Sequence, residues 1–350
     1  MRILIVGGTG YIGPHVVGRL VALGHEVAVY HRGKTGADLP AGVVRFLGDR
    51  AEIEGRRPEI ERLAPEVVLD MRPITGLQVE ALVRTVRGVA RRLVVLSSGD
   101  VYRAYGIFLR TEPGPPEPTP IAEDAALRTA LFPYRGPTPR PEGDPSRWVD
   151  DYDKIPVERS AMADPALPGT VLRLPMVYGP GDDLHRLHLY LKRMDDGRPA
   201  ILVDEAQAGW RCTRGYVGDV ARAIAAATVD PRASGRVYNV GEADALSEAE
   251  WVRAIGRACG WSGRVIPVPR GLMPGPMMDP DYSQDLVTDT SRIRDELGFR
   301  ESSPRDEAIA AGVAWERANP PAMIDAGAFD YEAEDVALAA VDRGESGRPG

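Results

Sequence analysis

The first hundred residues alternate between apolar runs and segments whose apolar positions have helical spacing. Runs rich in Val, Ile and Leu that are each followed by a helical segment are typical of a parallel sheet with both faces covered. The pattern therefore predicts an α/β fold built on a doubly wound parallel sheet. The apolar runs cover residues 2–8, 26–31, 43–49, 66–71 and 92–98, and helical patterns lie between them, as at 11–24 and 77–90.

A proline-rich interruption separates this half of the chain from a second alternating half. Residues 111–147 carry too much proline for a core element, so we expect an ordered loop over a site, with a surface insertion as the alternative. Ser247 and Glu250 have the spacing of a capping box at a helix start. Further strands are expected at 169–179, 199–205 and 236–241, and further helices at 153–163, 184–196, 217–228 and 247–260.

Composition and charge narrow the class of protein. Of the 350 residues, 43% are hydrophobic and 27% charged, and this length is enough for about two domains. The net charge of −8 argues against nucleic acid as the main partner, because phosphate binding needs a basic face. The two cysteines, Cys212 and Cys259, form no disulfide framework, which fits a reducing cytosol. No stretch approaches the roughly 20 apolar residues of a membrane span, so we expect a cytoplasmic protein without a membrane partner.

A glycine-rich turn follows the first apolar run. Gly7, Gly10 and Gly13 stand between a predicted strand and a predicted helix. Glycines at such a junction permit a tight turn and a close approach of the backbone, and the helix N-terminus offers N–H groups to a pyrophosphate. The motif therefore predicts a dinucleotide-binding loop.

The end of the second apolar run indicates which dinucleotide binds. Proteins that bind NAD through this fold usually carry an acid here, which accepts a hydrogen bond from the ribose 2′-hydroxyl. His31 holds that position, with Arg32 and Lys34 beside it. Two cations without an acid suit a 2′-phosphate, so we expect NADP, with NAD as the alternative. Asp49, at the end of the third run, is a candidate acceptor for the adenine amino group.

Six motifs in order make the chain similar to a known family over about residues 1–300. The chain resembles the extended short-chain dehydrogenase/reductase superfamily, in particular its NAD-dependent epimerase/dehydratase group. The glycine spacing at 7–13 belongs to that group, and Ser98, four residues before Tyr102, matches its catalytic serine. Later landmarks match at LRLPMVYGPGD (172–182), GYVGDVARAI (215–224), VYNVG (237–241) and DTSRIRDELGF (289–299).

The resemblance implies a Rossmann-type sheet, a smaller C-terminal substrate domain, a cleft between them, and hydride transfer to or from a bound nicotinamide. Many members are dimers, so a homodimer is compatible with it. We expect the NADP-binding domain at residues 1–175 plus about 215–240, the substrate domain at 176–214 and 241–320, and an acidic C-terminal tail at 331–350 that is disordered over 343–350. The expected cofactor contacts are Gly7, Thr9, Gly10, Tyr11, Ile12, Gly13, His31, Arg32, Lys34, Asp49, Arg50, Met71, Lys154 and Pro175.

Two positions depart from the pattern of the nucleotide-sugar members. Met176 replaces the asparagine that many of them carry before VYGP. The cation that holds a diphosphate is out of register, with Arg211 and Arg214 flanking Cys212. Because of these departures, we expect a smaller, less anionic alcohol or carbonyl compound as the substrate as readily as a nucleotide sugar.

The largest departure lies at the catalytic helix, where the family places a tyrosine four residues before the lysine. Asp150 holds that position relative to Lys154. Pro156 favours a helix that begins after Asp153 as N-cap, because proline costs about 3 kcal/mol in a helix interior but little in the first turn. Tyr152 would then lie just before the helix and could point into the cleft. A helix that begins earlier would place Asp150 beside Lys154, although an aspartate with an ordinary pKa near 4 is a poor proton donor.

The favoured function is an NAD(P)-dependent oxidoreductase or epimerase acting on a hydroxyl or carbonyl of a small metabolite or sugar derivative. Its expected catalytic residues are Ser98, Lys154 and either Tyr152 or Asp150. The alternative is a non-catalytic dinucleotide-binding relative, either a sensor or an RNA-associated protein. The acidic charge disfavours RNA, and Ser98 with Lys154 argues against loss of the chemistry. His185 and His188, expected on one helix face, lack acids or cysteines at ligand spacing, so no metal site is expected.

Overall fold

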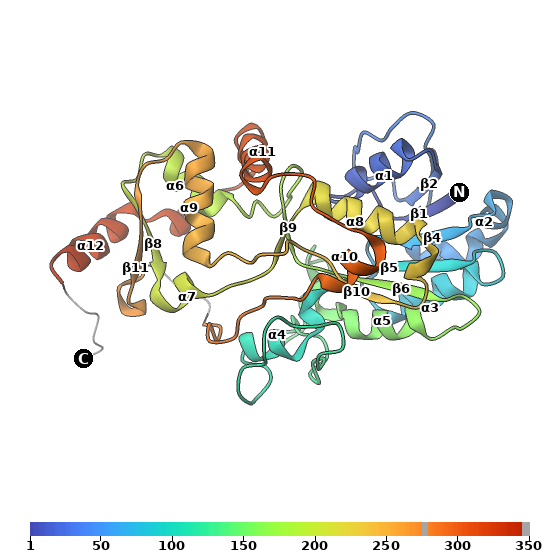
Figure 1. Cartoon of the computed structure of the whole chain (residues 1–350), viewed down its shortest axis with the longest axis horizontal. Helices are drawn as coiled ribbons and strands as arrows, with labels where there is room; N and C mark the ends of the chain where they lie inside the picture. Colours follow the sequence, from blue (N-terminus) through green and yellow to red (C-terminus); the bar gives the residue numbers. More distant parts are fainter. Residues whose placement is uncertain (275–278, 345–350) are drawn as a thin grey trace.

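Seven parallel strands form the central sheet of the protein. The computed structural model describes residues 1–274 and 279–344. The strand order is β10-β6-β5-β4-β1-β2-β3, so the chain reverses its direction of travel between β1 and β4 (Figure 1). Open α/β sheets bind ligands at the carboxyl ends of the strands beside such a reversal. The predicted doubly wound fold is confirmed. Its strands are β1 (Arg2–Val6), β2 (Glu26–His31), β3 (Val44–Leu47), β4 (Val67–Asp70), β5 (Arg92–Ser98), β6 (Gly169–Leu174) and β10 (Val237–Asn239).

Helices cover both faces of this sheet. On one face α1 (Gly13–Ala22), α8 (Val217–Val229) and α10 (Ser291–Leu297) share a core with alternate strand residues. On the other face α2 (Arg57–Leu63), α3 (Gly76–Val86) and α5 (Lys154–Met162) close a second core. Because both faces are buried, the strands are continuous apolar runs, which explains why they were visible in the sequence.

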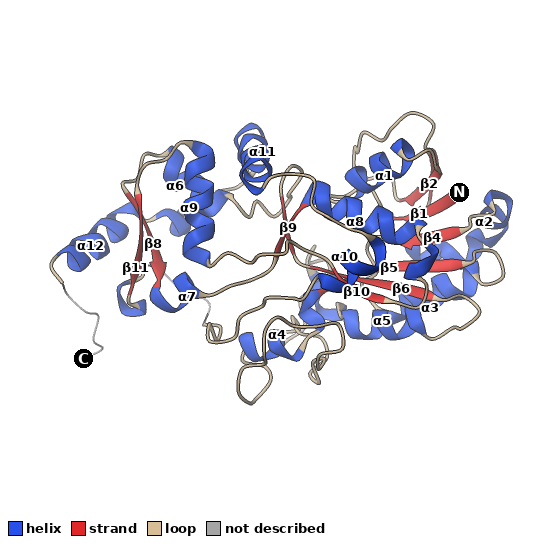
Figure 2. Cartoon of the chain, in the orientation of Figure 1, coloured by secondary structure: helices blue, strands red, loops and turns tan. Residues whose placement is uncertain are grey.

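A smaller lobe has a hydrophobic core of its own. Two parallel pairs of strands belong to it, β8 (Ala200–Asp204) with β11 (Arg264–Val268), and β7 (Met176–Tyr178) with β9 (Arg214–Tyr216). Figure 2 shows the β8–β11 pair beside helices at the end of the molecule opposite to the large sheet. This separate core supports the proposed division into two domains. The helices of this core are α6 (His188–Asp195), α7 (Glu205–Gly209), α9 (Glu248–Cys259) and α11 (Arg305–Ala318), and α12 (Tyr331–Asp342) is joined to α6 by an ion pair.

Several element boundaries test the sequence-based expectations. The capping box of Ser247 and Glu250 is present at the start of α9, as predicted. The single strand expected at 169–179 is wrong, because Pro175 separates β6, which pairs in the large sheet, from β7, which pairs with β9. Proline has no N–H for a strand ladder, so the chain changes sheets there. The helix expected at 184–196 begins only at His188.

The proline-rich segment is a loop that reaches back to the sheet. It follows α4 (Arg103–Phe108) and ends in a short 3₁₀ helix, Arg147–Asp151. Glu112 accepts hydrogen bonds from the backbone N–H groups of Thr129 (2.6 Å) and Ala130 (2.8 Å). These internal contacts agree with the expected ordered loop.

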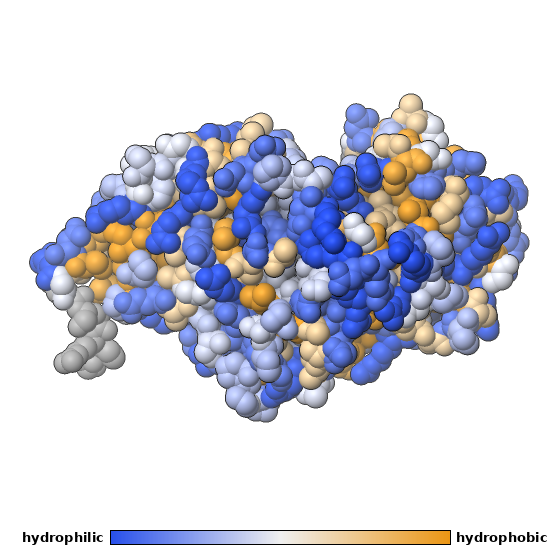
Figure 3. Space-filling view, in the orientation of Figure 1, coloured by the Kyte–Doolittle hydropathy of each residue, from blue (hydrophilic) through white to orange (hydrophobic). Residues whose placement is uncertain are grey.

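The C-terminal region is more structured than the expected acidic tail. Residues 331–342 form α12, whose Glu334 is buried and paired with Arg193 of α6. The expectation of disorder at 343–350 falls mainly on residues 345–350, which lie outside the described residues. Hydrophilic residues cover most of the face in Figure 3, and apolar ones gather near the α12 end, where Val336 is exposed. Within the described part of the chain, none of the helices has the length and apolar content needed to cross a bilayer.

Candidate active site

The glycine-rich turn joins β1 to α1 and forms a close backbone cradle. Gly7 and Gly8 have φ of +92° and +85°, in the left-handed region that favours glycine. A Cβ on Gly13 would lie 2.3 Å from the carbonyl carbon of Gly8, so no other residue fits there. Close packing of the turn against the helix N-terminus suits a pyrophosphate. The residues present therefore fit the dinucleotide that the fold implies.

Neighbouring segments hold this cradle in place. The Cβ of Met71, after β4, would lie 3.4 Å from a Cβ on Gly7, so the two segments are in contact. The Tyr11 hydroxyl donates to the carbonyl of Gly179 at 3.4 Å, and the His15 ring nitrogen Nε2 lies 3.1 Å from the carbonyl of Pro180. The loop after β7 thus packs against the cradle and links it to the smaller lobe.

The end of β2 presents an uncharged imidazole and two exposed cations. His31 is buried, its Nδ1 accepts a hydrogen bond from the N–H of Gly33 at 3.2 Å, and burial lowers its pKa. Its Nε2 is buried and has no partner in the described chain. Arg32 and Lys34 are exposed and make no ion pair with any described residue. Asp49 is exposed, with one oxygen accepting from Ala51 N at 3.0 Å.

Arg50, one of the expected cofactor contacts, forms an ion pair beside the cradle. Its guanidinium pairs with the buried Asp70 at the end of β4 and donates to the carbonyl of Arg72 at 2.9 Å. Burial raises the pKa of Asp70, while the charges of Arg50 and Lys154 oppose that shift. Arg50 therefore neutralises a buried acid beside the cradle.

Lys154 begins α5 with its ammonium group buried. Nζ donates to the carbonyls of Pro73 and, at 3.2 Å, Leu96, and lies 5.3 Å from the centre of the Tyr152 ring. Burial lowers the pKa of Lys154 to about 8, while the negative charges of Asp100 and Asp70 act to raise it. The lysine is thus held between β4 and β5 at the edge where the strands end.

The predicted start of α5 is confirmed. Asp153 is the N-cap, its Oδ1 accepts from Ile155 N at 2.9 Å, and Pro156 falls in the first turn. Tyr152 lies before the helix with an extended backbone, φ −69° and ψ 121°. It is therefore free of the helical geometry that would turn its side chain away from Lys154.

Tyr152 meets Ser98 and a buried carboxylate. Its hydroxyl donates to Oδ2 of Asp100 at 2.9 Å. Burial, followed by the negative charge of Asp100, raises the pKa of Tyr152 well above its usual range, while a hydrogen bond with Ser98 acts to lower it. Ser98 ends β5, and its hydroxyl accepts from Asp100 N at 3.2 Å. Ser98, Tyr152 and Lys154 are thus brought together.

Asp150 points to a different partner. Its carboxylate accepts from the backbone N–H of Arg140 at 2.7 Å and from the Arg140 guanidinium. These bonds lower the pKa of Asp150, with the backbone bond as the first cause. The alternative in which α5 extends back to Asp150 and sets it beside Lys154 is wrong, because the helix begins at Lys154.

Sequence reasoning missed two members of this cluster. Asp100 lies two residues after Ser98, at the carboxyl end of a predicted strand, so its position carried a signal that was overlooked. Tyr134 comes from the proline-rich loop, and its hydroxyl donates to Oδ2 of Asp100 at 3.0 Å. No spacing in the sequence predicts that Tyr134 belongs to the site, because only the path of the loop brings it to β5.

The other residues considered from the sequence have structural partners. The Tyr102 hydroxyl donates to Asn239 at 2.6 Å, in keeping with a structural role. His185 lies before α6 rather than on it, with its Nδ1 2.6 Å from Oε1 of Glu316. Across the described residues, no group of three or more His, Cys, Asp or Glu side chains is arranged to hold a metal ion.

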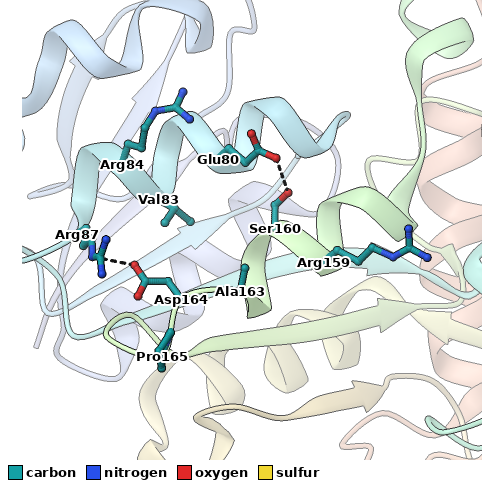
Figure 4. A pocket seen from close by; sticks show the side chains of 9 residues that line it. All are labelled: Glu80, Val83, Arg84, Arg87, Arg159, Ser160, Ala163, Asp164 and Pro165. Atoms are coloured by element: carbon teal, nitrogen blue, oxygen red, sulfur yellow. Dashed lines mark hydrogen bonds and ion pairs between the residues drawn. The ribbon is translucent and has the colours of Figure 1, made fainter.

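A groove of about 620 Å³ lies elsewhere, on the outer side of α3 and α5 (Figure 4). Glu80 accepts a hydrogen bond from Ser160 at 3.2 Å across it, and Arg87 pairs with Asp164 at 3.0 Å. None of the predicted site residues lines this groove. It is therefore separate from the Ser98–Tyr152–Lys154 cluster.

A doubly wound sheet, a glycine cradle at its first turn and a serine–tyrosine–lysine cluster at its carboxyl edge together define a dinucleotide-dependent enzyme class. The sequence model of the NAD dependent epimerase/dehydratase family matches residues 156–241. The chain is similar to enzymes of the extended short-chain dehydrogenase/reductase superfamily, and these comparisons support an NAD(P)-dependent enzyme of the epimerase/dehydratase or reductase type.

Characterised relatives include both reductases and epimerases. The 2′-dehydrokanamycin reductase of Streptomyces kanamyceticus is 27% identical, over 83% of this chain and 75% of the relative. The UDP-glucose 4-epimerase of Streptomyces lividans is 26% identical, over 93% of this chain and 99% of the relative. The 3-diazoavenalumate denitrifying reductase of a Streptomyces species is 27% identical, over 78% of this chain and 84% of the relative.

Solved structures share the fold. The UDP-glucose 4-epimerase of Thermus thermophilus, in complex with NAD, has a TM-score of 0.63 and 24% identity, over 91% of this chain and all of that one. The UDP-glucose 4-epimerase of Stenotrophomonas maltophila has a TM-score of 0.67 and 19% identity, over 91% of this chain and 98% of that one.

Proposed function

We propose that the protein is an NADP(H)-dependent oxidoreductase that reduces a carbonyl group of a small, weakly charged molecule, with Tyr152 as proton donor. The observation that carries the proposal is the hydrogen bond from the Tyr152 hydroxyl to buried Asp100 at 2.9 Å. A phenol that is buried against a carboxyl group keeps its proton at neutral pH, as the raised pKa of Tyr152 also indicates. A retained proton suits donation to a carbonyl oxygen better than removal of one from an alcohol.

The chain's own residues support a bound dinucleotide at the carboxyl edge. The turn from Gly7 to Gly13 would receive the pyrophosphate, and Arg32 and Lys34 a 2′-phosphate. Lys154 would hold the nicotinamide ribose by donating from its ammonium group. When bound, the nicotinamide supplies the hydride for the reaction.

Three side chains then act on the substrate oxygen, each in a different role. Tyr152 donates its proton to that oxygen, Ser98 orients it by a hydrogen bond, and the positive charge of Lys154 stabilises the phenolate left on Tyr152. The proline-rich loop covers the cluster through Tyr134 and through the contact of Trp148 with the Tyr152 ring, with 6.2 Å between ring centres. The cover limits the access of water to the reacting groups.

Ion pairs in the smaller lobe support a substrate with little negative charge. Arg214 is buried and paired with Glu248, and its guanidinium lies 4.6 Å from the Trp251 ring centre. Arg211 pairs with Glu250 at 3.5 Å. Both arginines considered for a diphosphate therefore have their charge balanced by a glutamate.

The test is NADPH consumption by the purified protein across a panel of aldehydes and ketones that includes oxidised aminoglycosides and aromatic carbonyl compounds. We expect turnover with at least one neutral or cationic carbonyl compound. The absence of turnover with every compound, together with conversion of UDP-glucose to its 4-epimer, would replace reduction by epimerisation. Epimerisation is the second candidate because the Streptomyces lividans epimerase aligns over 99% of its length.

The cofactor preference has its own test in Arg32. A charge-assisted arginine–phosphate contact contributes about 1.5–3 kcal/mol. Arg32→Ala should therefore weaken NADPH binding by about ten- to a hundredfold and leave NADH binding little changed. Calorimetric titration of both variants with both nucleotides measures this. Equal affinity of the wild type for NADPH and NADH would contradict the preference.

A further inference from the structure

Asp100 is the acceptor at the centre of a buried hydrogen-bond cluster. Its Oδ2 receives the hydroxyl of Tyr152 at 2.9 Å and that of Tyr134 at 3.0 Å, and Tyr134 lies 3.1 Å from the hydroxyl of Tyr105. Asp100 is only 4% exposed, and its Oδ1 is buried without a partner in the described chain. A buried carboxyl group that has one oxygen without a partner is costly as a carboxylate, and less so as a neutral acid.

The charged groups around Asp100 are few. Arg128 is buried, and its guanidinium donates to the backbone carbonyl of Asp100 and pairs with Asp153 at 3.3 Å. Lys154 approaches from α5, and its charge, like that of Arg128, lowers the pKa of Asp100. Burial is the larger cause and raises that pKa. The carboxyl is therefore held where it can gain or lose a proton without direct contact with solvent.

We infer that Asp100 is the proton reservoir of the site and exchanges a proton with Tyr152 during the reaction. The inference rests on the proposed function. In carbonyl reduction the Tyr152 hydroxyl turns to the substrate oxygen and gives it its proton. The acid proton of Asp100 then passes from Oδ2, which lies 2.9 Å from the Tyr152 hydroxyl, to the Tyr152 oxygen. A bound nicotinamide would supply the hydride to the substrate carbon, and Asp100 would be left as a carboxylate. Tyr134 stabilises that carboxylate by its hydrogen bond, and the reverse transfers accompany alcohol oxidation.

The inference is tested by ultraviolet titration of tyrosinate, which needs neither substrate nor nucleotide. Subtracting the spectrum of Tyr152→Phe from that of the wild type isolates the signal of Tyr152. Subtracting the spectrum of the double variant Asp100→Asn/Tyr152→Phe from that of Asp100→Asn isolates the same signal in the absence of the carboxylate. We expect tyrosinate from residue 152 at lower pH in Asp100→Asn than in the wild type, because the negative charge beside the Tyr152 hydroxyl is gone. Asp151→Asn, an exposed acid paired with Arg135, is the matched control and should leave the titration unchanged. The same titration midpoint for Tyr152 in Asp100→Asn and the wild type would overturn the inference.

A second measurement stands if Asp100→Asn does not fold. The infrared band of a protonated carboxyl should persist to higher pH in Tyr152→Phe than in the wild type, because that variant loses a hydrogen bond that stabilises the Asp100 carboxylate. Identical titration of the band in both proteins would contradict the exchange. Once a substrate is known, Asp100→Asn should lower kcat for reduction by about a hundredfold or more with little change in KM, since only proton delivery is affected. These spectroscopic outcomes hold whichever substrate, or none, is found in the panel.

Discussion

Lys154 carries its charge in a fully enclosed position. Its ammonium group donates to two backbone carbonyls and faces the buried acids Asp70 and Asp100, neither of which forms an ion pair with it. Burial lowers its pKa from the ordinary 10.5 to about 8. The same site that suits a nicotinamide ribose therefore makes this lysine easy to neutralise.

The lowered pKa of Lys154 predicts a change of stability with pH. Between pH 8 and 10.5 the unfolded chain still binds the lysine proton while the folded chain has released it, so folding becomes more favourable as pH rises. Relative to Lys154→Met, the wild type should gain on the order of 3 kcal/mol in free energy of unfolding across this window. Urea denaturation at a series of pH values measures it. The carbonyls left without a donor in Lys154→Met change its free energy of unfolding by the same amount at every pH. A difference between the two proteins that does not vary with pH would therefore contradict the pKa shift.

Asp153 shows how one side chain fixes an element. Besides capping α5, its carboxylate accepts from Phe132 N at 2.6 Å and pairs with Arg128, and both side chains of that ion pair are at most 1% exposed. The start of the helix and the position of the proline-rich loop therefore depend on the same residue. This shared dependence keeps Tyr152 and Tyr134 on either side of Asp100.

Asp153→Ala should cost far more stability than an ordinary cap substitution. Loss of a helix cap costs about 1 kcal/mol, and leaving a buried charge such as Arg128 unpaired costs about 3–5 kcal/mol. Ser247→Ala, which removes only the cap of α9, is the matched control. Chemical denaturation of both variants gives the comparison. Equal losses would mean that the buried ion pair contributes nothing.

Element positions were predictable where one local rule was decisive. Doubly buried strands are continuous apolar runs, and Pro156 with Asp153 located the start of α5. The break at Pro175 shows the limit, because both halves of 169–179 are apolar and only pairing with different partners separates them. Asp150 was weighed because of its spacing from Lys154, and its actual partner, Arg140, lies in a loop whose path no periodicity describes.

At the scale of the whole molecule, the site is assembled from distant parts of the chain. The cradle comes from the first strand–helix junction, Ser98 and Asp100 from the end of β5, Tyr134 from the loop, and Tyr152 and Lys154 from the start of α5. The sheet order brings these ends to one edge, which the alternating pattern could predict. Which side chain of the loop reaches that edge depends on tertiary packing.

The account therefore depends on Tyr152 taking the place of the tyrosine that the family resemblance leads us to expect four residues before the lysine. The most direct test is kcat for NADPH-dependent reduction by Tyr152→Phe, compared with Asp150→Asn, on a carbonyl compound that the wild type reduces. We expect Tyr152→Phe to lose about a hundredfold or more in kcat while its NADPH dissociation constant stays unchanged, because only the proton donor is removed. Asp150→Asn should retain most of its turnover, since Asp150 bonds to Arg140. Full activity of Tyr152→Phe together with an inactive Asp150→Asn would contradict the account.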